Sequence, residues 1–130
     1  MMTKKLNNKM NLAHIKNVLE AEVLCGHDYL DKEIKMAYAS DLMSDVLAFV
    51  KSGSFLLTGL TNSQVIRTAE MAEISAVCFV NGKTPQPDTI NLADEKKIPL
   101  IVTKLLMYEC CGRLHEKGLA SDDDSEKIES

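Results

Sequence analysis

Polar and hydroxyl side chains follow the apolar runs of this sequence at points where a strand pattern gives way to a helix pattern. The two clearest turns, residues 39–45 and 58–64, contain side chains or backbone suited to binding a ligand: Asp41, Ser44, Thr58, Gly59, Thr61 and Asn62. Because the carboxyl ends of parallel strands lie at one edge of a sheet, we expect these residues to meet where α/β folds bind ligands. The sequence therefore predicts the place of a site, although it contains no complete catalytic or metal-binding motif.

The first turn, with Asp41, Ser44 and Asp45, is open to two interpretations. In one, Asp41 caps the helix that follows, and Asp45 complements the positive end of the helix dipole. In the other, one of these carboxylates faces a ligand hydroxyl, an amine or a bound cation. The residue types alone leave both interpretations open, and Asp is a preferred residue at helix N-caps.

The second turn offers more than a helix cap requires. Gly59 lets the backbone approach a ligand closely, and the free N–H groups of a helix starting near Asn62 favour phosphate or carboxylate. Thr61 and Gln64 also match the Ser/Thr-x-x-Glu/Gln capping box, so a plain cap is the alternative. Lys104 follows the last expected strand, where it either neutralises a bound anion at the same edge or remains solvated.

Other chemical motifs are incomplete. Residues 82–84, Gly-Lys-Thr, resemble the end of a P-loop, but that motif needs a glycine at the position of Val77, inside an expected strand. Cys110 and Cys111 are neighbours on an expected helix and point about 100° apart, so we expect them to pack in the core. We therefore expect a protein that is not an enzyme, with no cofactor and no bound metal.

Length and composition predict one globular domain. The chain has 130 residues, of which 45% are hydrophobic and 26% charged, enough for a core of its own. The net charge is −4, and the last ten residues, with five acidic side chains and one lysine, account for all of it. A neutral body with an acidic tail is a poor match for nucleic acid.

The compartment is also predicted. No apolar stretch approaches the roughly 18 residues that cross a bilayer, and we expect no signal peptide and no membrane association. The four cysteines show no regular spacing, which favours free thiols in the reducing cytoplasm.

Hydrophobic spacing predicts alternating strands and helices. The expected strands are residues 22–25, 34–40, 54–58, 76–80 and 99–103. The expected helices are residues 11–20, 41–50, 61–72, 87–96 and 107–117. This alternation is typical of an α/β fold: a single domain with a mostly parallel sheet and helices packed on it. We place the domain at residues 11–118, between a flexible lead-in (1–10) and a disordered acidic tail (119–130).

The ordered segments 38–47, 57–59, 80–85 and 98–103 resemble the DRTGG domain family. The most specific segment is Ala-Ser-Asp-Leu-Met-Ser-Asp at residues 39–45, which is similar to that of the small single-domain members. The resemblance covers residues 11–119. It implies an α/β fold similar to the N-terminal domain of HPr kinase/phosphorylase, and distantly to the uridine-nucleotide-binding domain of Mur ligases.

The resemblance also implies a role. Family members are regulatory segments of phosphotransacetylases and lie between CBS domains in some inorganic pyrophosphatases, where they are non-catalytic and accompany nucleotide sensing or dimer contacts. This sequence departs from the family pattern at one loop, where Val80-Asn81-Gly82 stands in place of Thr-Gly-Gly. The resemblance therefore assigns no phosphate-loop role to Asn81 and Gly82.

Two hypotheses of function are consistent with these observations. The first is a cytoplasmic, non-catalytic regulatory domain that binds a nucleotide or phosphorylated metabolite at the carboxyl edge of its sheet. The residues assigned to this site are Asp41, Ser44, Thr58, Gly59, Thr61, Asn62 and Lys104. The second is a protein–protein adaptor without a small ligand, which acts as a homodimer or on a partner enzyme through a sheet edge or an apolar helix face.

Overall fold

The computed structural model describes residues 10–121 of the chain. Along these residues the elements follow in the order β1 (Met10–Asn11), α1 (Leu12–Val18), β2 (Glu22–Cys25), the 3-10 turn η2 (His27–Tyr29), β3 (Glu33–Ile34), β4 (Met36–Ala39), α2 (Met43–Phe49), β5 (Phe55–Thr58), α3 (Ser63–Met71), β6 (Ala76–Phe79), α4 (Pro87–Glu95), β7 (Leu100–Val102), α5 (Met107–Glu116) and β8 (Ala120–Ser121).

The main sheet has six strands in the order β2-β7-β6-β5-β4-β8. The strands from β7 to β8 in this order pair in parallel, and β2 runs antiparallel to β7 at one edge. The strands β1 and β3 form a separate antiparallel pair. The α/β domain with a mostly parallel sheet that the sequence indicates is therefore confirmed.

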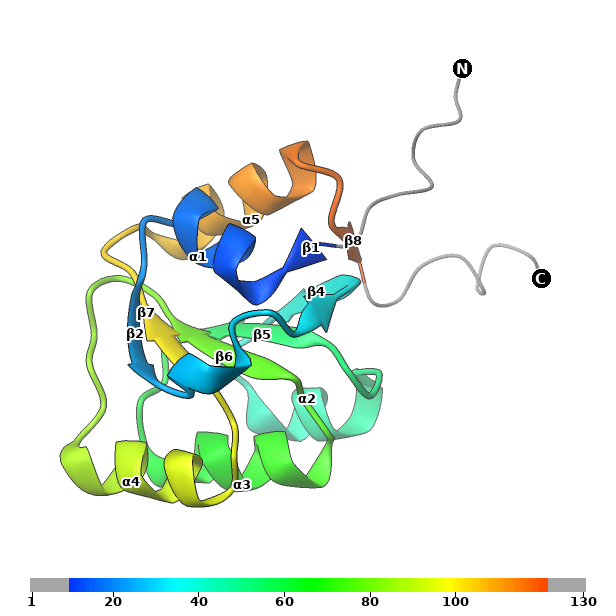
Figure 1. Ribbon diagram of the computed structural model, residues 1–130. Helices are drawn as coiled ribbons and strands as arrows, with labels where there is room; N and C mark the ends of the chain where they lie inside the picture. Colours follow the sequence, from blue (N-terminus) through cyan, green and yellow to red (C-terminus); the bar gives the residue numbers. More distant parts are fainter. Residues whose placement is uncertain (1–9, 122–130) are drawn as a thin grey trace.

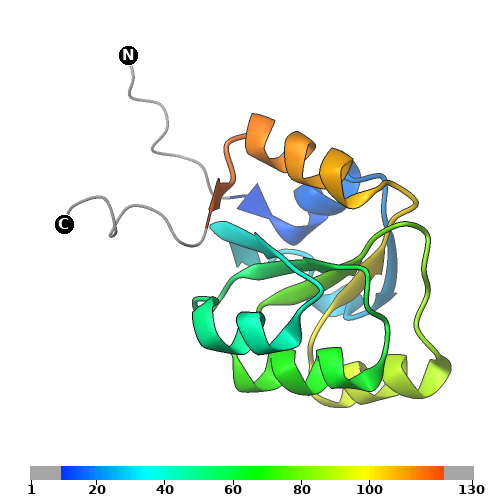
Figure 2. The same ribbon diagram turned by 180° about the vertical axis from the view of Figure 1, so that it is seen from behind.

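Helices cover both faces of the sheet, with α1 and α5 on one side and α2, α3 and α4 on the other (Figures 1 and 2). Alternate strand residues enter the two cores: Leu57 and Cys78 pack with α1 and α5, whereas Leu56 and Val77 pack with α2 to α4. All four residues of β5 and of β6 are buried. Burial on both faces explains why these strands read as continuous apolar runs in the sequence.

The strand expected over residues 34–40 is two strands in two sheets. Ile34 belongs to β3 and pairs with Met10 of β1, whereas the main-sheet strand β4 begins only at Met36. Ile34 is fully buried in the core beneath α1 and α5. The prediction of one strand is wrong because the chain leaves one sheet and enters the other without a turn residue that would mark the change.

The folded domain is wider than the predicted residues 11–118. Met10 is buried, Leu119 is buried against the α5 side of the core, and β8 adds residues 120–121 to the sheet beside β4. The predicted lead-in and disordered tail are therefore wrong for residues 10 and 119–121. The other residues of these two segments, 1–9 and 122–130, lie outside the described residues.

Gly26 marks a close approach between the end of β2 and the residue before β7. Its φ is +86°, and a Cβ there would lie 2.6 Å from the Pro99 Cα atom. Gly53 has a similar φ of +90°, but no atom lies within 4 Å of its Cβ position. A side chain would therefore strain the backbone at both positions, but it would overlap other atoms only at Gly26.

We expect Gly26→Ala to lower the free energy of unfolding by roughly 1–3 kcal/mol more than Gly53→Ala, because overpacking adds to the strain at positive φ. Urea denaturation of both variants measures the difference. Equal losses would contradict the close packing of β2 on the start of β7.

Candidate functional site

Three of the turns at the carboxyl edge of the sheet close with the same hydroxyl hydrogen bond. The side-chain hydroxyl oxygens of Ser40, Thr58 and Thr103 accept the N–H of the residue two positions further on, at 3.0, 3.2 and 3.1 Å. Hydroxyl residues favour such turns because they satisfy a backbone donor as the chain leaves the strand. The polar step that recurs in the sequence therefore has a local structural cause.

Asp41 connects two of these turns. Its Oδ1 atom accepts hydrogen bonds from Thr58 Oγ1 at 3.0 Å and from the Gly59 N–H at 2.6 Å. The helix α2 begins after the N-cap residue Leu42, without a side-chain cap. The interpretation of Asp41 as the cap of α2 is therefore wrong. Gly59 is buried, so its N–H requires a partner within the protein, and Asp41 supplies it.

The cap of α3 is Asn62, whose Oδ1 accepts the N–H of Gln64 at 3.1 Å. The capping box of Thr61 and Gln64 is therefore wrong, because the helix begins one residue later than that motif requires. Thr61 is half-buried and Ser44 is exposed in the first turn of α2. Neither forms a side-chain hydrogen bond to another of the residues that the structure describes.

The predicted site residues occupy different parts of the edge. Asp41, Thr58 and Gly59 form one hydrogen-bonded cluster, and a Cβ at Gly59 would lie 3.7 Å from the amide nitrogen of Asn81. Lys104 lies further along the edge, beside a cavity of about 310 Å³. Of the residues assigned to the site, Lys104 is therefore the one that lines this cavity.

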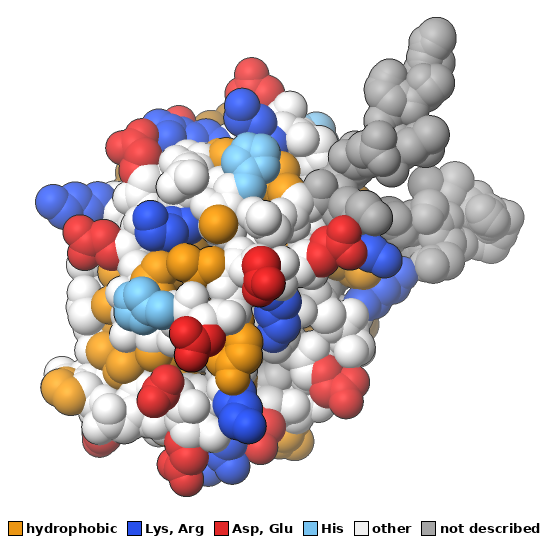
Figure 3. Space-filling model, viewed as in Figure 1, with side chains coloured by type: hydrophobic (Ala, Val, Ile, Leu, Met, Phe, Trp, Pro, Cys, Tyr) orange, Lys and Arg blue, Asp and Glu red, His pale blue; other side chains and the backbone are white. Residues whose placement is uncertain are grey.

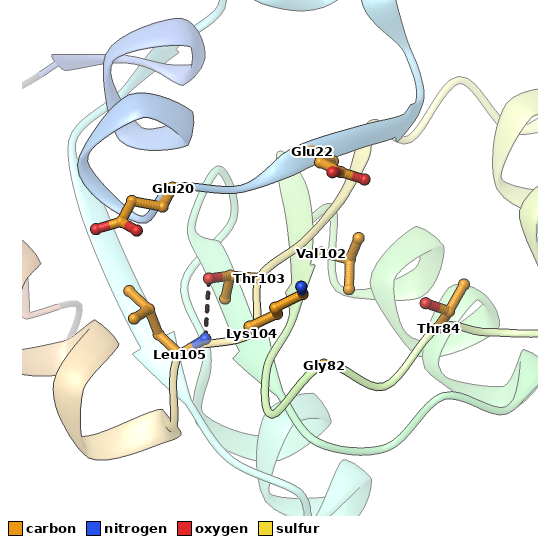
Figure 4. A pocket seen from close by; sticks show the side chains of 8 residues that line it. All are labelled: Glu20, Glu22, Gly82, Thr84, Val102, Thr103, Lys104 and Leu105. Carbon is orange, nitrogen blue, oxygen red and sulfur yellow. Dashed lines mark hydrogen bonds between the residues drawn. The ribbon is translucent and has the colours of Figure 1, made fainter.

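The cavity lies where the turns after β6 and β7 meet the start of β2. Its walls are formed by Glu20, Glu22, Gly82, Thr84, Val102, Thr103, Lys104 and Leu105. In Figure 4, Lys104 and Glu22 point toward the same space, which Val102 and Thr84 border. The Glu20 carboxylate points away from that space, and its Oε2 atom pairs with Arg113 Nη1 at 2.8 Å.

Backbone hydrogen bonds hold the walls of the cavity. The N–H groups of Asn81 and Gly82 donate to Leu105 O at 2.9 Å and to Thr103 O at 2.8 Å, with both residues at positive φ. Thr103 Oγ1 donates to Leu19 O at 2.6 Å and joins this turn to the end of α1. Because the N–H groups of Asn81 and Gly82 are occupied, they do not form a phosphate cradle.

Glu20, Glu22 and Thr84 contribute to the cavity, and the sequence did not indicate them. Glu22 reaches it because β2 joins the sheet antiparallel to β7, and Glu20 because the chain turns at φ +53° after α1. The sequence did predict a strand at residues 22–25 with the acidic residue Glu22 at its start. Periodicity could not predict that this strand pairs with β7, and this pairing places Glu22 in the cavity.

The cysteines belong to the core and lie outside this cavity. Burial raises the pKa of the Cys110 thiol to about 11 and raises the pKa of Cys78 well above its ordinary value. Such thiols are weak nucleophiles, because the thiolate is the reactive form. Across residues 10–121, no group of three or more His, Cys, Asp or Glu side chains is placed to hold a metal. No helix in this part of the chain is long and apolar enough to span a membrane.

The elements form a three-layer α/β domain with a small cavity at the carboxyl edge of its sheet. The family model of the DRTGG domain matches residues 14–116. The chain therefore belongs to the DRTGG domain family, and the resemblance seen in the sequence is confirmed.

A solved structure has a similar fold. It contains the CBS and DRTGG domains of the regulatory region of Clostridium perfringens pyrophosphatase, complexed with the activator diadenosine tetraphosphate. The TM-score is 0.66 at 16% sequence identity, and the match covers 88% of this chain and 51% of that chain. At this identity the likeness concerns the fold, and the present chain spans about half of the other one. A search of the curated proteins finds no match.

The role of Asp41 can be tested by stability. We expect Asp41→Ala to lower the free energy of unfolding by about 1–3 kcal/mol, because the buried Gly59 N–H loses its acceptor. Asp45→Ala should lower it by about 0.3–1 kcal/mol, since Asp45 interacts with the helix dipole only. Urea denaturation measures both. A larger loss for Asp45→Ala would contradict the link between the two turns.

The cap of α3 gives a second stability test. We expect Asn62→Ala to lower the free energy of unfolding by about 1 kcal/mol, because the first turn of the helix loses a hydrogen-bond acceptor. Thr61→Ala is the matched control and should cost less, since its hydroxyl forms no cap. Thermal unfolding of the two variants should rank them in this order, and the reverse order would restore the capping box.

Proposed function

We propose that this DRTGG domain is a non-catalytic regulatory module that binds a phosphorylated or nucleotide-like small ligand at the carboxyl edge of its sheet. The observation that carries the proposal is the position of Lys104, an exposed cation beside the cavity of about 310 Å³. Lys104 has no ion pair with any of residues 10–121, so its charge is available to an anion. Cavities of roughly 300–1,000 Å³ are typical of small-molecule sites.

The other assigned residues have a supporting part in this proposal. Asp41, Thr58 and Gly59 hold the turns after β4 and β5 in place, further along the same edge, through hydrogen bonds that already occupy the Thr58 hydroxyl. Asn62 stabilises α3, and Ser44 and Thr61 lie at the same edge. Lys104 is the direct contact to the ligand.

The comparison supports a regulatory role at the level of the family. The similar protein is the regulatory region of an enzyme and is bound to a nucleotide activator. We extend only the class of ligand to this chain, because the two share 16% sequence identity. The proposal includes action in the cytoplasm, as a homodimer or docked on a partner enzyme, with neither nucleic acid nor a membrane as partner. On the face shown in Figure 3, acidic and basic side chains are intermixed and form no large basic region of the kind that binds nucleic acid.

A ligand screen tests the proposal. We expect inorganic phosphate, AMP or UMP to raise the melting temperature by several degrees, because a ligand at 100 times its Kd stabilises by about 2.7 kcal/mol. Lys104→Ala should weaken the binding by about tenfold or more, since a charge-assisted hydrogen bond is lost. Lys83→Ala is the matched control: Lys83 is exposed in the neighbouring turn and does not line the cavity.

The contradicting outcomes are defined by the same experiment. Equal losses in the Lys104 and Lys83 variants would exclude this cavity as the binding site. No stabilisation by any of the three compounds, together with a dimer in sedimentation analysis, would favour the adaptor function. Exposed apolar side chains on α2 and α3, namely Leu47, Phe49 and Met71, are the surface that such an adaptor offers.

A further inference from the structure

We infer that the cavity beside Lys104 selects a nucleoside monophosphate and discriminates against polyphosphates, with Glu22 as the residue that determines this specificity. The inference rests on the proposed function, because it names the class of ligand for the same site. It follows from the charge, the hydrogen-bonding capacity and the size of the cavity.

The charges of the cavity match one anionic group. Lys104 is the one basic side chain in its lining, and Glu20 and Glu22 are the acidic ones. Arg113 binds Glu20 at 2.8 Å and Glu109 at 2.9 Å, so its guanidinium is already engaged by two carboxylates. A single phosphate can pair with Lys104. A polyphosphate would add negative charge to a cavity whose lining holds Glu20 and Glu22 and offers no second cation, and such uncompensated like charges disfavour the wrong ligand.

Glu22 is suited to hydrogen-bond donors on the ligand. Its side chain is exposed on β2 and forms no hydrogen bond or ion pair with any described residue, although it faces the same space as Lys104 (Figure 4). An ionised carboxylate only accepts hydrogen bonds. The vicinal hydroxyls of a ribose are donors of the kind that an acidic residue binds in dinucleotide sites. Glu22 therefore complements a sugar whose phosphate is held by Lys104.

The size and shape of the cavity agree with one nucleotide. A volume of about 310 Å³ lies at the lower end of the range for small-molecule sites, which suits a small ligand such as one nucleotide. Val102 supplies an apolar surface, and Thr84 a hydroxyl on the opposite side (Figure 4). The Cβ position of Gly82 is 3.9 Å from the Lys104 Cα and Cγ atoms, so the β6 turn packs along the stem of the lysine.

Isothermal titration calorimetry of the full chain at constant ionic strength tests the inference. The probes are AMP, UMP, ATP and 2′,3′-dideoxy-AMP, which lacks both ribose hydroxyls. We expect AMP and UMP to bind at least about tenfold more tightly than dideoxy-AMP, because dideoxy-AMP cannot donate its ribose hydroxyls to the Glu22 carboxylate. We expect a similar preference over ATP, because ATP brings additional negative charge into a cavity with two carboxylates.

Two variants of Glu22 separate its charge from its hydrogen bonds. Glu22→Gln keeps the size and one acceptor oxygen, so the preference for AMP over ATP should shrink while AMP still binds. Glu22→Ala should abolish the difference between AMP and dideoxy-AMP. Glu95→Ala, at the end of α4 and outside the cavity, should retain both preferences of the unmodified protein.

The outcomes distinguish this inference from the proposed function. If ATP binds as tightly as AMP, or dideoxy-AMP as tightly as AMP, the role of Glu22 is wrong. Should Lys104→Ala still lose binding in that case, the proposed function stands without the inference. If none of the four nucleotides binds, the inference and the nucleotide-binding function both fail.

Discussion

The structure depends on the burial of a parallel sheet on both faces. All residues of β5 and β6 are buried, and alternate side chains contact α1 and α5 on one side and α2 to α4 on the other. Parallel strands can be connected only through crossovers, so each strand must deliver the chain to a helix at the same edge. The polar chemistry of the protein is therefore concentrated where the core ends.

At that edge, the need to satisfy backbone groups determines what remains for a ligand. Ser40, Thr58 and Thr103 each bind an N–H two residues on, and Asp41 binds the buried N–H of Gly59. These bonds stiffen the turns, but they also occupy the atoms that resembled a binding site. Among the described residues that line the cavity, the charged side chains of Lys104 and Glu22, at the β7 and β2 end of the edge, form no ion pair with another described residue.

The chain belongs to the DRTGG family and shares its fold with the CBS and DRTGG domains of a pyrophosphatase regulatory region. The charges of the cavity differ from those of a polyphosphate site. One lysine is opposed by Glu22, and Arg113 is held by Glu20 and Glu109. In the proposed function, this balance of charge is the property that favours a monophosphate over a larger nucleotide such as the one bound to the similar protein.

The sequence by itself determined the class of fold and the order of the central strands and helices along the chain, and it predicted the edge at which a site is expected. These properties depend on local periodicity, as in the continuous apolar run of β6, and on turn chemistry, as at Thr58. Contacts between distant segments decided the rest. The hydrogen-bond partner Thr58 is 17 residues from Asp41, and β3 pairs with β1 in a separate sheet. Glu22 lines the same cavity as Lys104 because β2 pairs antiparallel with β7. Local sequence patterns do not predict such pairings, because the pairings depend on which surfaces pack together once the whole chain has folded.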